Sequence, residues 1–229
     1  MTLFRPALAI ELSQRQGMVC GRSAEGREEC RSFSTGNRTR DELLPAIDDV
    51  ARTLGFAPRD LALLGVDIGP GGFTGLRVSI ATVQGIAEIS GAAVVGVKGA
   101  MIAAASTPAA CQANGEVLVL LAAKKESVWA TRLILNDSKW QEVGSPGVFD
   151  TPPEASPALV LADEYLPASW REAFEAHGTA ILTPTYDAAV LLDLAEEQAA
   201  QGETIAADTL VPLYPREPEA VRLWQERHG

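Results

Sequence analysis

The chain has 229 residues, of which 47% are hydrophobic and 21% are charged, a composition that excludes general disorder. Its 30 acidic and 19 basic residues give a net charge of -11, which repels phosphate backbones at long range. We therefore expect no direct nucleic acid binding by the isolated chain. The apolar runs fall far below the roughly 18 residues of a membrane span, so no membrane role is expected.

The first part of the chain alternates between apolar runs of strand length and segments with helical periodicity. Three strands precede the first helix, so the sheet is expected to be mixed rather than wholly parallel. The predicted strands cover residues 7–12, 18–20, 29–34, 61–68 and 93–97. The predicted helices cover 43–54, a stretch from the 69–75 segment to about residue 90, and 99–106.

The remainder of the chain repeats this plan more loosely. Strands are predicted at 117–122, 128–135, 159–161 and 180–182, and helices near 168–176 and 186–200. Glycine and proline at 144–147 and 152–153 mark an exposed connection. Two halves that each combine a hairpin-led sheet with alternating helices predict a duplicated α/β architecture, with mixed sheets flanked by helices.

The residues that usually carry catalysis or bind metals are sparse. Cys20, Cys30 and Cys111 include no CxxC pair; Cys20 and Cys30 could face each other across a hairpin, but buried free thiols in a cytoplasmic protein are expected. His177 and His228 are too far apart for an HExxH pair, and no GxSxG or GxxxxGK[ST] motif occurs. We therefore predict no catalytic residue and no metal site.

The most informative local feature is the segment Gly69-Pro70-Gly71-Gly72-Phe73-Thr74-Gly75, which joins a buried strand to a helix. Thr74 is a suitable N-cap, and glycine amides at a helix N-terminus form an anion site by geometry. One interpretation is a phosphate cradle. The other is a tight strand-to-helix turn with close packing, which the lack of an accompanying lysine favours.

The helix that follows carries two apolar stripes. Leu76, Ile80, Val83 and Ala87 fall on one stripe, and Val78, Ile86 and Ile89 fall on a second, nearly opposite stripe beside Thr82, with Arg77 at its polar margin. A surface helix needs only one apolar stripe. The helix is either sandwiched inside the domain or partly covered by a second protein. We predict an interface with a partner, centred on the second stripe and formed by Leu76, Arg77, Val78, Thr82, Ile86 and Ile89.

These residues resemble those of a known family. The segment Gly69 to Val78 is similar to the GPGSFTGLRIG signature of the TsaB (YeaZ) family, formerly labelled glycoproteases. Collinear, weaker similarities occur at 9–13 for the opening AIDTS strand, at 43–45 for the LLP helix and at 212–216 for the PLYLR element. The similarity therefore extends over nearly the whole chain.

The resemblance implies an actin-like (ASKHA, ribonuclease H-like) fold of two lobes, which we place at residues 1–106 and 107–229, with a C-terminal segment that could pack back on the first lobe. It implies a non-catalytic subunit of the complex that transfers threonylcarbamoyl to the adenosine next to the tRNA anticodon. The implied partners are a TsaD-like catalytic paralogue and a TsaE-like ATPase, with a homodimer when the chain is alone. The alternatives are an ATP-dependent ASKHA-type transferase, a metallopeptidase, and a homodimeric structural protein outside the pathway.

The chain departs from the family pattern at polar positions. Glu11-Leu12 replaces the opening Asp-Thr, where an actin-like phosphate site uses a short acid and a hydroxyl. We therefore predict at most a vestigial phosphate loop and no bound cofactor, with ATP or ADP and magnesium only in a complex. The residues of that vestigial loop would be Glu11, Ser13, Gly69, Gly71, Gly72, Thr74 and Gly75.

Lys124 and Lys125 follow the second half's first predicted strand. A cationic pair there could meet tRNA phosphate, although a solvated hairpin tip is the expected arrangement.

Overall fold

The computed structural model of the chain describes residues 5–34, 42–123 and 126–214. Contacts divide the chain into two compact units, the first comprising residues 1–112 and 184–212, and the second 113–183 and 213–229. The predicted lysine pair Lys124-Lys125 and the last part of the 212–216 element lie outside the described residues. These units are defined by contacts within the structure, whereas the predicted lobes were defined as the two related halves of the sequence. The predicted lobe boundary at residue 106 therefore stays a prediction.

The first unit is built on a five-stranded mixed sheet with the order β3-β2-β1-β4-β5. Its strands are β1 (Ala7–Glu11), β2 (Gln16–Arg22), β3 (Glu28–Ser34), β4 (Leu63–Gly69) and β5 (Ala93–Lys98). The first three strands pair antiparallel, whereas β1, β4 and β5 pair parallel. This confirms the mixed sheet that the order of the sequence elements predicted.

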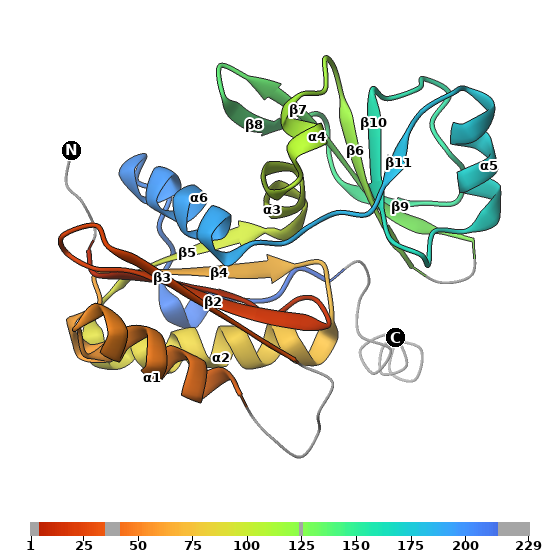
Figure 1. Cartoon of the computed structure of the whole chain (residues 1–229). Helices are drawn as coiled ribbons and strands as arrows, with labels where there is room; N and C mark the ends of the chain where they lie inside the picture. Colours follow the sequence, from red (N-terminus) through yellow and green to blue (C-terminus); the bar gives the residue numbers. More distant parts are fainter. Residues whose placement is uncertain (1–4, 35–41, 124–125, 215–229) are drawn as a thin grey trace, which may run out of the picture. The chain divides into compact units, whose positions relative to one another are not determined.

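Helices cover both faces of this sheet (Figure 1). One face packs against α1 (Leu43–Leu54) and α2 (Phe73–Ser90), and the other against α3 (Gly99–Ser106) and α6 (Ala188–Ala200). Strand alternation divides the two cores: Leu8 and Ile10 face the first pair of helices, whereas Ala7 and Ala9 face the second. The small side chains and Gly65 let α6 lie close to the sheet, because a Cβ at Gly65 would be 2.8 Å from that of Ala195.

Shorter elements complete the first unit. They are the 3-10 turns Pro58–Asp60 and Ala207–Thr209 and the short helix α4 (Pro108–Cys111). After α6, Ile205 forms an antiparallel bridge with Val94. The Gln84 side chain donates to the carbonyl oxygens of Ala207 at 2.9 Å and Leu210 at 3.2 Å, which holds this late segment against α2.

The second unit contains a six-stranded sheet with the order β11-β10-β6-β7-β8, and β9 pairs with β7. Helix α5 (Ala168–Ala176) packs against this sheet, and its Trp170 and Phe174 are buried in the core of the unit. Two short strands, β8 and β9, were not expected from the sequence. The strands are β6 (Val117–Ala122), β7 (Val128–Asn136), β8 (Lys139–Glu142), β9 (Gly147–Phe149), β10 (Leu159–Ala162) and β11 (Ile181–Leu182).

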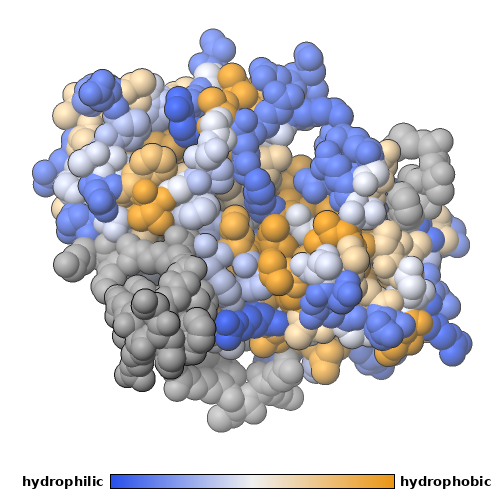
Figure 2. All heavy atoms as spheres, turned by 180° about the vertical axis from the view of Figure 1, so that it is seen from behind, coloured by the Kyte–Doolittle hydropathy of each residue, from blue (hydrophilic) through white to orange (hydrophobic). Residues whose placement is uncertain are grey.

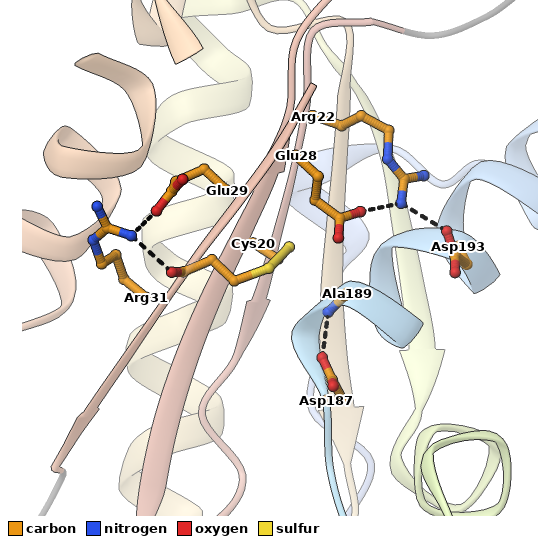
Figure 3. The surroundings of a disulfide bond; sticks show 9 residues. Cys20, Arg22, Glu28, Glu29, Arg31, Asp187, Ala189 and Asp193 are labelled. Atoms are coloured by element: carbon orange, nitrogen blue, oxygen red, sulfur yellow. Dashed lines mark hydrogen bonds and ion pairs between the residues drawn. A yellow bond between two sulfur atoms is a disulfide. The ribbon is translucent and has the colours of Figure 1, made fainter. Parts of the chain in front are cut away.

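The expectation of buried free thiols is wrong for Cys20 and Cys30. Cys20 on β2 and Cys30 on β3 are direct register partners with Cα atoms 4.1 Å apart, and they form a disulfide bond (Figure 3). Cys111 is free but exposed. The pairing depends on strand register, which the spacing of the cysteines in the sequence does not contain.

Candidate functional site

The predicted phosphate loop lies at one end of the first unit's sheet, where β1 and β4 end and α2 begins. Gly72 is the N-cap residue of α2, and its backbone N–H donates to the carbonyl oxygen of Ser13 at 2.8 Å. Thr74 lies in the first turn and is exposed, so the prediction that it caps the helix is wrong. The loop and the turn after β1 are thus in direct backbone contact.

The glycines of this loop are required by that contact. A Cβ at Gly71 would lie 2.6 Å from the Cβ of Ser13, and a Cβ at Gly75 would lie 1.8 Å from the carbonyl oxygen of Leu12. Gly69 has a φ of 91°, in the left-handed region that side-chain-bearing residues avoid. Close packing therefore accounts for the glycine-rich segment without any ligand.

Two carboxyl groups are buried beneath the loop. The side chain of Glu11, at the end of β1, is 1% exposed, and that of Asp67 on β4 is 0% exposed. Burial raises the pKa of Glu11 well above its ordinary value, with the neighbouring Asp67 adding to the effect, and burial also raises the pKa of Asp67. Asp67 was missed in the sequence, where the only signal was one acid within an apolar strand.

Two backbone donors of the loop are already engaged. The N–H of Gly69 donates to Asp67 Oδ1 at 2.6 Å, and the N–H of Gly72 is held by Ser13. A phosphate that used these two amides would have to replace these bonds and approach two buried acids. These bonds can stabilise the junction of β1, β4 and α2. The vestigial phosphate site stays a prediction.

The second predicted site is the outer face of α2. Leu76, Ile80, Val83 and Ala87 are buried as one stripe against the sheet, so this stripe belongs to the core. The prediction of Leu76 at a partner interface is wrong, because its side chain is fully buried within the chain. On the other side Val78 is 39% exposed and Ile89 is 77% exposed.

Ile86 differs from these outer residues, because it is half-buried and packs against the core. Ser79 on the same helix is buried.

The polar residues beside this face make contacts within α2 itself. The guanidinium of Arg77 lies 3.7 Å from the ring centroid of Phe73, one turn earlier, and the hydroxyl of Thr82 donates to the carbonyl of Val78. Phe73 and, on α1, Leu44 are also exposed. Figure 2 shows that hydrophobic residues reach the surface in patches between hydrophilic ones on the side opposite to that of Figure 1.

One group of residues has metal-ligand spacing in the described part of the chain. A sulfur of Cys20, a sulfur of Cys30 and a carboxylate oxygen of Glu28 lie within 4.8 Å of one another. The two sulfurs are joined in the disulfide, and the Glu28 carboxylate is paired with Arg22, which also binds Asp193 on α6 (Figure 3). The group is therefore explained as a link between β2, β3 and α6.

The second unit contains a cavity of about 360 Å3 with mostly apolar walls. Trp170, Phe149 and two prolines, Pro152 and Pro153, contribute to its lining. Arg132 at the wall is held by two hydrogen bonds to Glu116, at 2.9 and 2.7 Å. Glu154 also contributes to the lining, and this mixture of side chains does not point to a particular ligand.

The fold and the glycine-capped helix after β4 place the chain in the actin-like (ASKHA) class. A family model described as TsaD, tRNA N6-adenosine threonylcarbamoyltransferase, matches residues 35–148. Among curated proteins, the chain is 26% identical over 202 residues to the tRNA threonylcarbamoyladenosine biosynthesis protein TsaB of Escherichia coli (strain K12), covering 82% of this chain and 83% of that protein. The chain is therefore similar to the TsaB (YeaZ) family, from which its sequence diverges.

Solved structures support the same fold. A Pseudomonas aeruginosa protein described as similar to peptidase YEAZ matches with a TM-score of 0.75 at 24% identity, over 92% of this chain and 99% of that one. YeaZ from Pseudomonas aeruginosa matches with a TM-score of 0.73 at 24% identity, over 91% and 98% of the two chains. In the described residues, no helix of this chain is both long enough and apolar enough to cross a membrane.

Proposed function

We propose that this chain is the TsaB-type subunit of a complex that makes threonylcarbamoyladenosine in tRNA, and that it supports a TsaD-like catalytic paralogue without carrying the chemistry itself. The family supports the pathway, because the Escherichia coli relative is named as a threonylcarbamoyladenosine biosynthesis protein. The exposed apolar face of α2 supports a role through contact with another protein. A TsaE-like ATPase would join this pair, and ATP or ADP with magnesium would bind only in the assembled complex.

The outer face of α2 is the single observation that supports the pairing. Ile89 is 77% exposed on this helix, and Val78 and Phe73 extend the apolar surface toward its N-terminus. A partner helix could cover these side chains, with Arg77 at the margin setting register more than affinity. In the absence of the paralogue, a second copy of the chain would cover the same face and form a homodimer.

The 69–75 loop supports a non-catalytic role. The backbone amides of Gly69 and Gly72 already have acceptors within the chain, and Glu11 and Asp67 are placed below them. His177, the histidine within the described residues, has its Nδ1 atom 2.7 Å from the carbonyl oxygen of Ala173. This arrangement favours the partner role over the transferase and metallopeptidase alternatives.

We also propose the cytoplasm as the compartment, because the proposed substrate is tRNA. A disulfide such as Cys20–Cys30 is uncommon in a reducing compartment, so this part of the proposal depends on the pathway and not on cysteine chemistry.

The proposal is tested by the variant Ile89→Asp, mixed with the TsaD-like subunit of the same organism. An unpaired charge buried in the interface should weaken the pairing at least about tenfold in a calorimetric titration, while circular dichroism stays unchanged. The matched control is Tyr165→Asp, which places an acid at another exposed apolar position, in the second unit.

Unchanged pairing and unchanged homodimerisation of Ile89→Asp, measured by analytical ultracentrifugation, would place the interface elsewhere. Loss of the homodimer with intact binding of the TsaD-like subunit would restrict the face to self-association. In cells that lack the natural protein, the wild type should restore threonylcarbamoyladenosine in tRNA and Ile89→Asp should not.

A further inference from the structure

Glu11 and Asp67 stand side by side on neighbouring strands of the first unit. The parallel pairing of β1 and β4 sets Ile10 opposite Val66, so the next residues along the two strands are Glu11 and Asp67. Both side chains lie on the sheet face that α3 and α6 cover, and a Cβ at Gly99, where α3 begins, would be 3.2 Å from both carboxyl oxygens of Asp67. The carboxyl groups are thus enclosed between the sheet and a helix.

One oxygen of each carboxyl group has donors within the chain. Glu11 Oε1 accepts the backbone N–H of Ser13 at 2.9 Å and its hydroxyl at 2.7 Å, whereas Asp67 Oδ1 accepts the N–H of Gly69 at 2.6 Å. The remaining oxygens, Glu11 Oε2 and Asp67 Oδ2, are buried without a donor from any described residue. Two ionised carboxylates in this position would leave both atoms unsatisfied and would repel each other.

We propose that Glu11 and Asp67 share one proton at neutral pH, carried by Glu11 and donated to Asp67, and that this proton-bridged pair latches the 69–75 loop onto the turn at Leu12-Ser13. The single proton supplies the missing donor to both orphan oxygens. Protonated Glu11 still accepts from Ser13 through its other oxygen, and ionised Asp67 still accepts from Gly69. Every oxygen of the pair then has a partner.

The latch reaches α2 through a short series of contacts. Asp67 holds Glu11 through the proton, Glu11 orients Ser13, and the carbonyl of Ser13 accepts the N–H of Gly72, the N-cap residue of α2. Loss of the proton leaves two negative charges in a buried space. The repulsion acts on the start of the 69–75 loop, which follows β4, and on the first turn of α2. We expect the contact between this loop and the Leu12-Ser13 turn to open.

The direction of the pKa shifts agrees with this assignment. Burial is the largest cause for both groups, and the pKa of Glu11 is raised well above its ordinary value, so the proton resides on Glu11. The hydrogen bond with Glu11 works against burial at Asp67 and favours its ionised form.

The elements around the pair differ in the charged and titratable groups that they carry. The α3 segment contributes none, since its residues from Gly99 to Ser106 carry no titratable side chain. The acidic groups of α6 that face the sheet edge are engaged by arginines, Asp193 by Arg22 and Glu196 by Arg5 and Arg22. Further groups are Arg15 after β1, Lys98 at the end of β5, Arg77 and Glu88 on α2, Tyr186 and the N-cap residue Asp187 before α6, and Glu197 on α6.

The experiment measures thermal unfolding of the isolated chain against pH for the wild type and Glu11→Gln. A group with a raised native pKa binds its proton more tightly in the native state than in the unfolded state. Stability is therefore fully present below the ordinary glutamate pKa and falls as pH rises through the raised pKa. Across that window the unfolding equilibrium constant of the wild type should increase by up to tenfold per pH unit relative to the variant.

Glu11→Gln keeps a donor toward Asp67 and an acceptor for Ser13 but cannot titrate, so its curve should lose this slope. The control Glu88→Gln changes an exposed acid on α2 and should follow the wild type. An infrared band of a protonated carboxylic acid should be present near neutral pH in the wild type and in the control, and absent in Glu11→Gln. Alkaline pH should speed exchange of the Gly72 amide in the wild type more than in Glu11→Gln.

Parallel stability curves for the wild type and Glu11→Gln, together with no acid band at neutral pH, would overturn the proposal. If Glu11→Gln does not fold, Asp67→Asn provides the second variant, because its amide can donate to an ionised Glu11. The pH window of its slope should move toward lower pH, because Asp67 no longer adds to the raised pKa of Glu11, and an unmoved window would contradict the shared proton. These readouts use the chain alone, so they are independent of the proposed partner.

Discussion

The N-terminal end of α2 and the outer face of the same helix differ in how far the chain covers them. At the N-terminal end, the chain's own backbone closes the site, with Gly72 bonded to Ser13 and a Cβ at Gly75 excluded by Leu12. Along the outer face, Val78 and Ile89 are exposed to solvent. The prominent motif is thus explained by packing inside the chain, whereas the less prominent hydrophobic stripe is the surface available to a partner.

The largest expected effect comes from exchanging glycine for alanine in each region. Gly75→Ala places a Cβ 1.8 Å from the carbonyl oxygen of Leu12, so it should lower the free energy of unfolding by at least about 3 kcal/mol. Gly85→Ala, on the same helix, meets nothing within 4 Å and should raise that free energy by about 0.5 to 1 kcal/mol. Urea unfolding followed by circular dichroism measures both.

Equal effects of the two glycine substitutions would contradict the contrast between a closed loop and an open face. A tolerated Gly75→Ala in particular would mean that α2 can shift away from the turn after β1 at little cost. The loop would then have room that the packing described above does not give it.

A smaller effect should separate two isoleucines of the outer stripe. Ile86→Asp places a charge where the side chain packs partly against the core, so it should reduce the free energy of unfolding by about 2 to 3 kcal/mol. Ile89→Asp, at a position that is 77% exposed, should change it by less than about 0.5 kcal/mol. Chemical denaturation of the two variants, with unchanged slopes against urea, provides the comparison.

A large loss of stability in Ile89→Asp measured on dilute monomer would show that this end of the stripe is also covered within the chain. An unaffected Ile86→Asp would move Ile86 back to the exposed surface, where the helical periodicity placed it.

Sequence periodicity predicted most strands and helices because burial alternates with a period of two or 3.6 residues, and these periods can be counted. It could not pair residues across strands. Asp67 was missed and Cys20–Cys30 was misjudged for the same reason: each depends on register, Ile10 beside Val66 in one case and Cys20 beside Cys30 in the other. Ile86 was assigned to the outer stripe from its angle on the helix alone. The core packing around α2 extends far enough around the helix to reach its side chain.

The smallest expected effect concerns nucleotides, and it tests the closed end of α2 directly. Millimolar ATP or ADP with magnesium should leave the melting temperature of the isolated chain unchanged, because a phosphate would have to displace the Ser13 carbonyl from Gly72 and approach the acids at Glu11 and Asp67. A ligand that binds only the native state stabilises it in proportion to the logarithm of its concentration over Kd, so a saturable rise in a thermal-shift titration would reveal a site. The same titration on the complex with the TsaD-like subunit gives the contrast, because there a rise is expected. A rise of about 2 °C or more in the isolated chain would mean that the glycine loop opens to a ligand, and packing alone would no longer explain it.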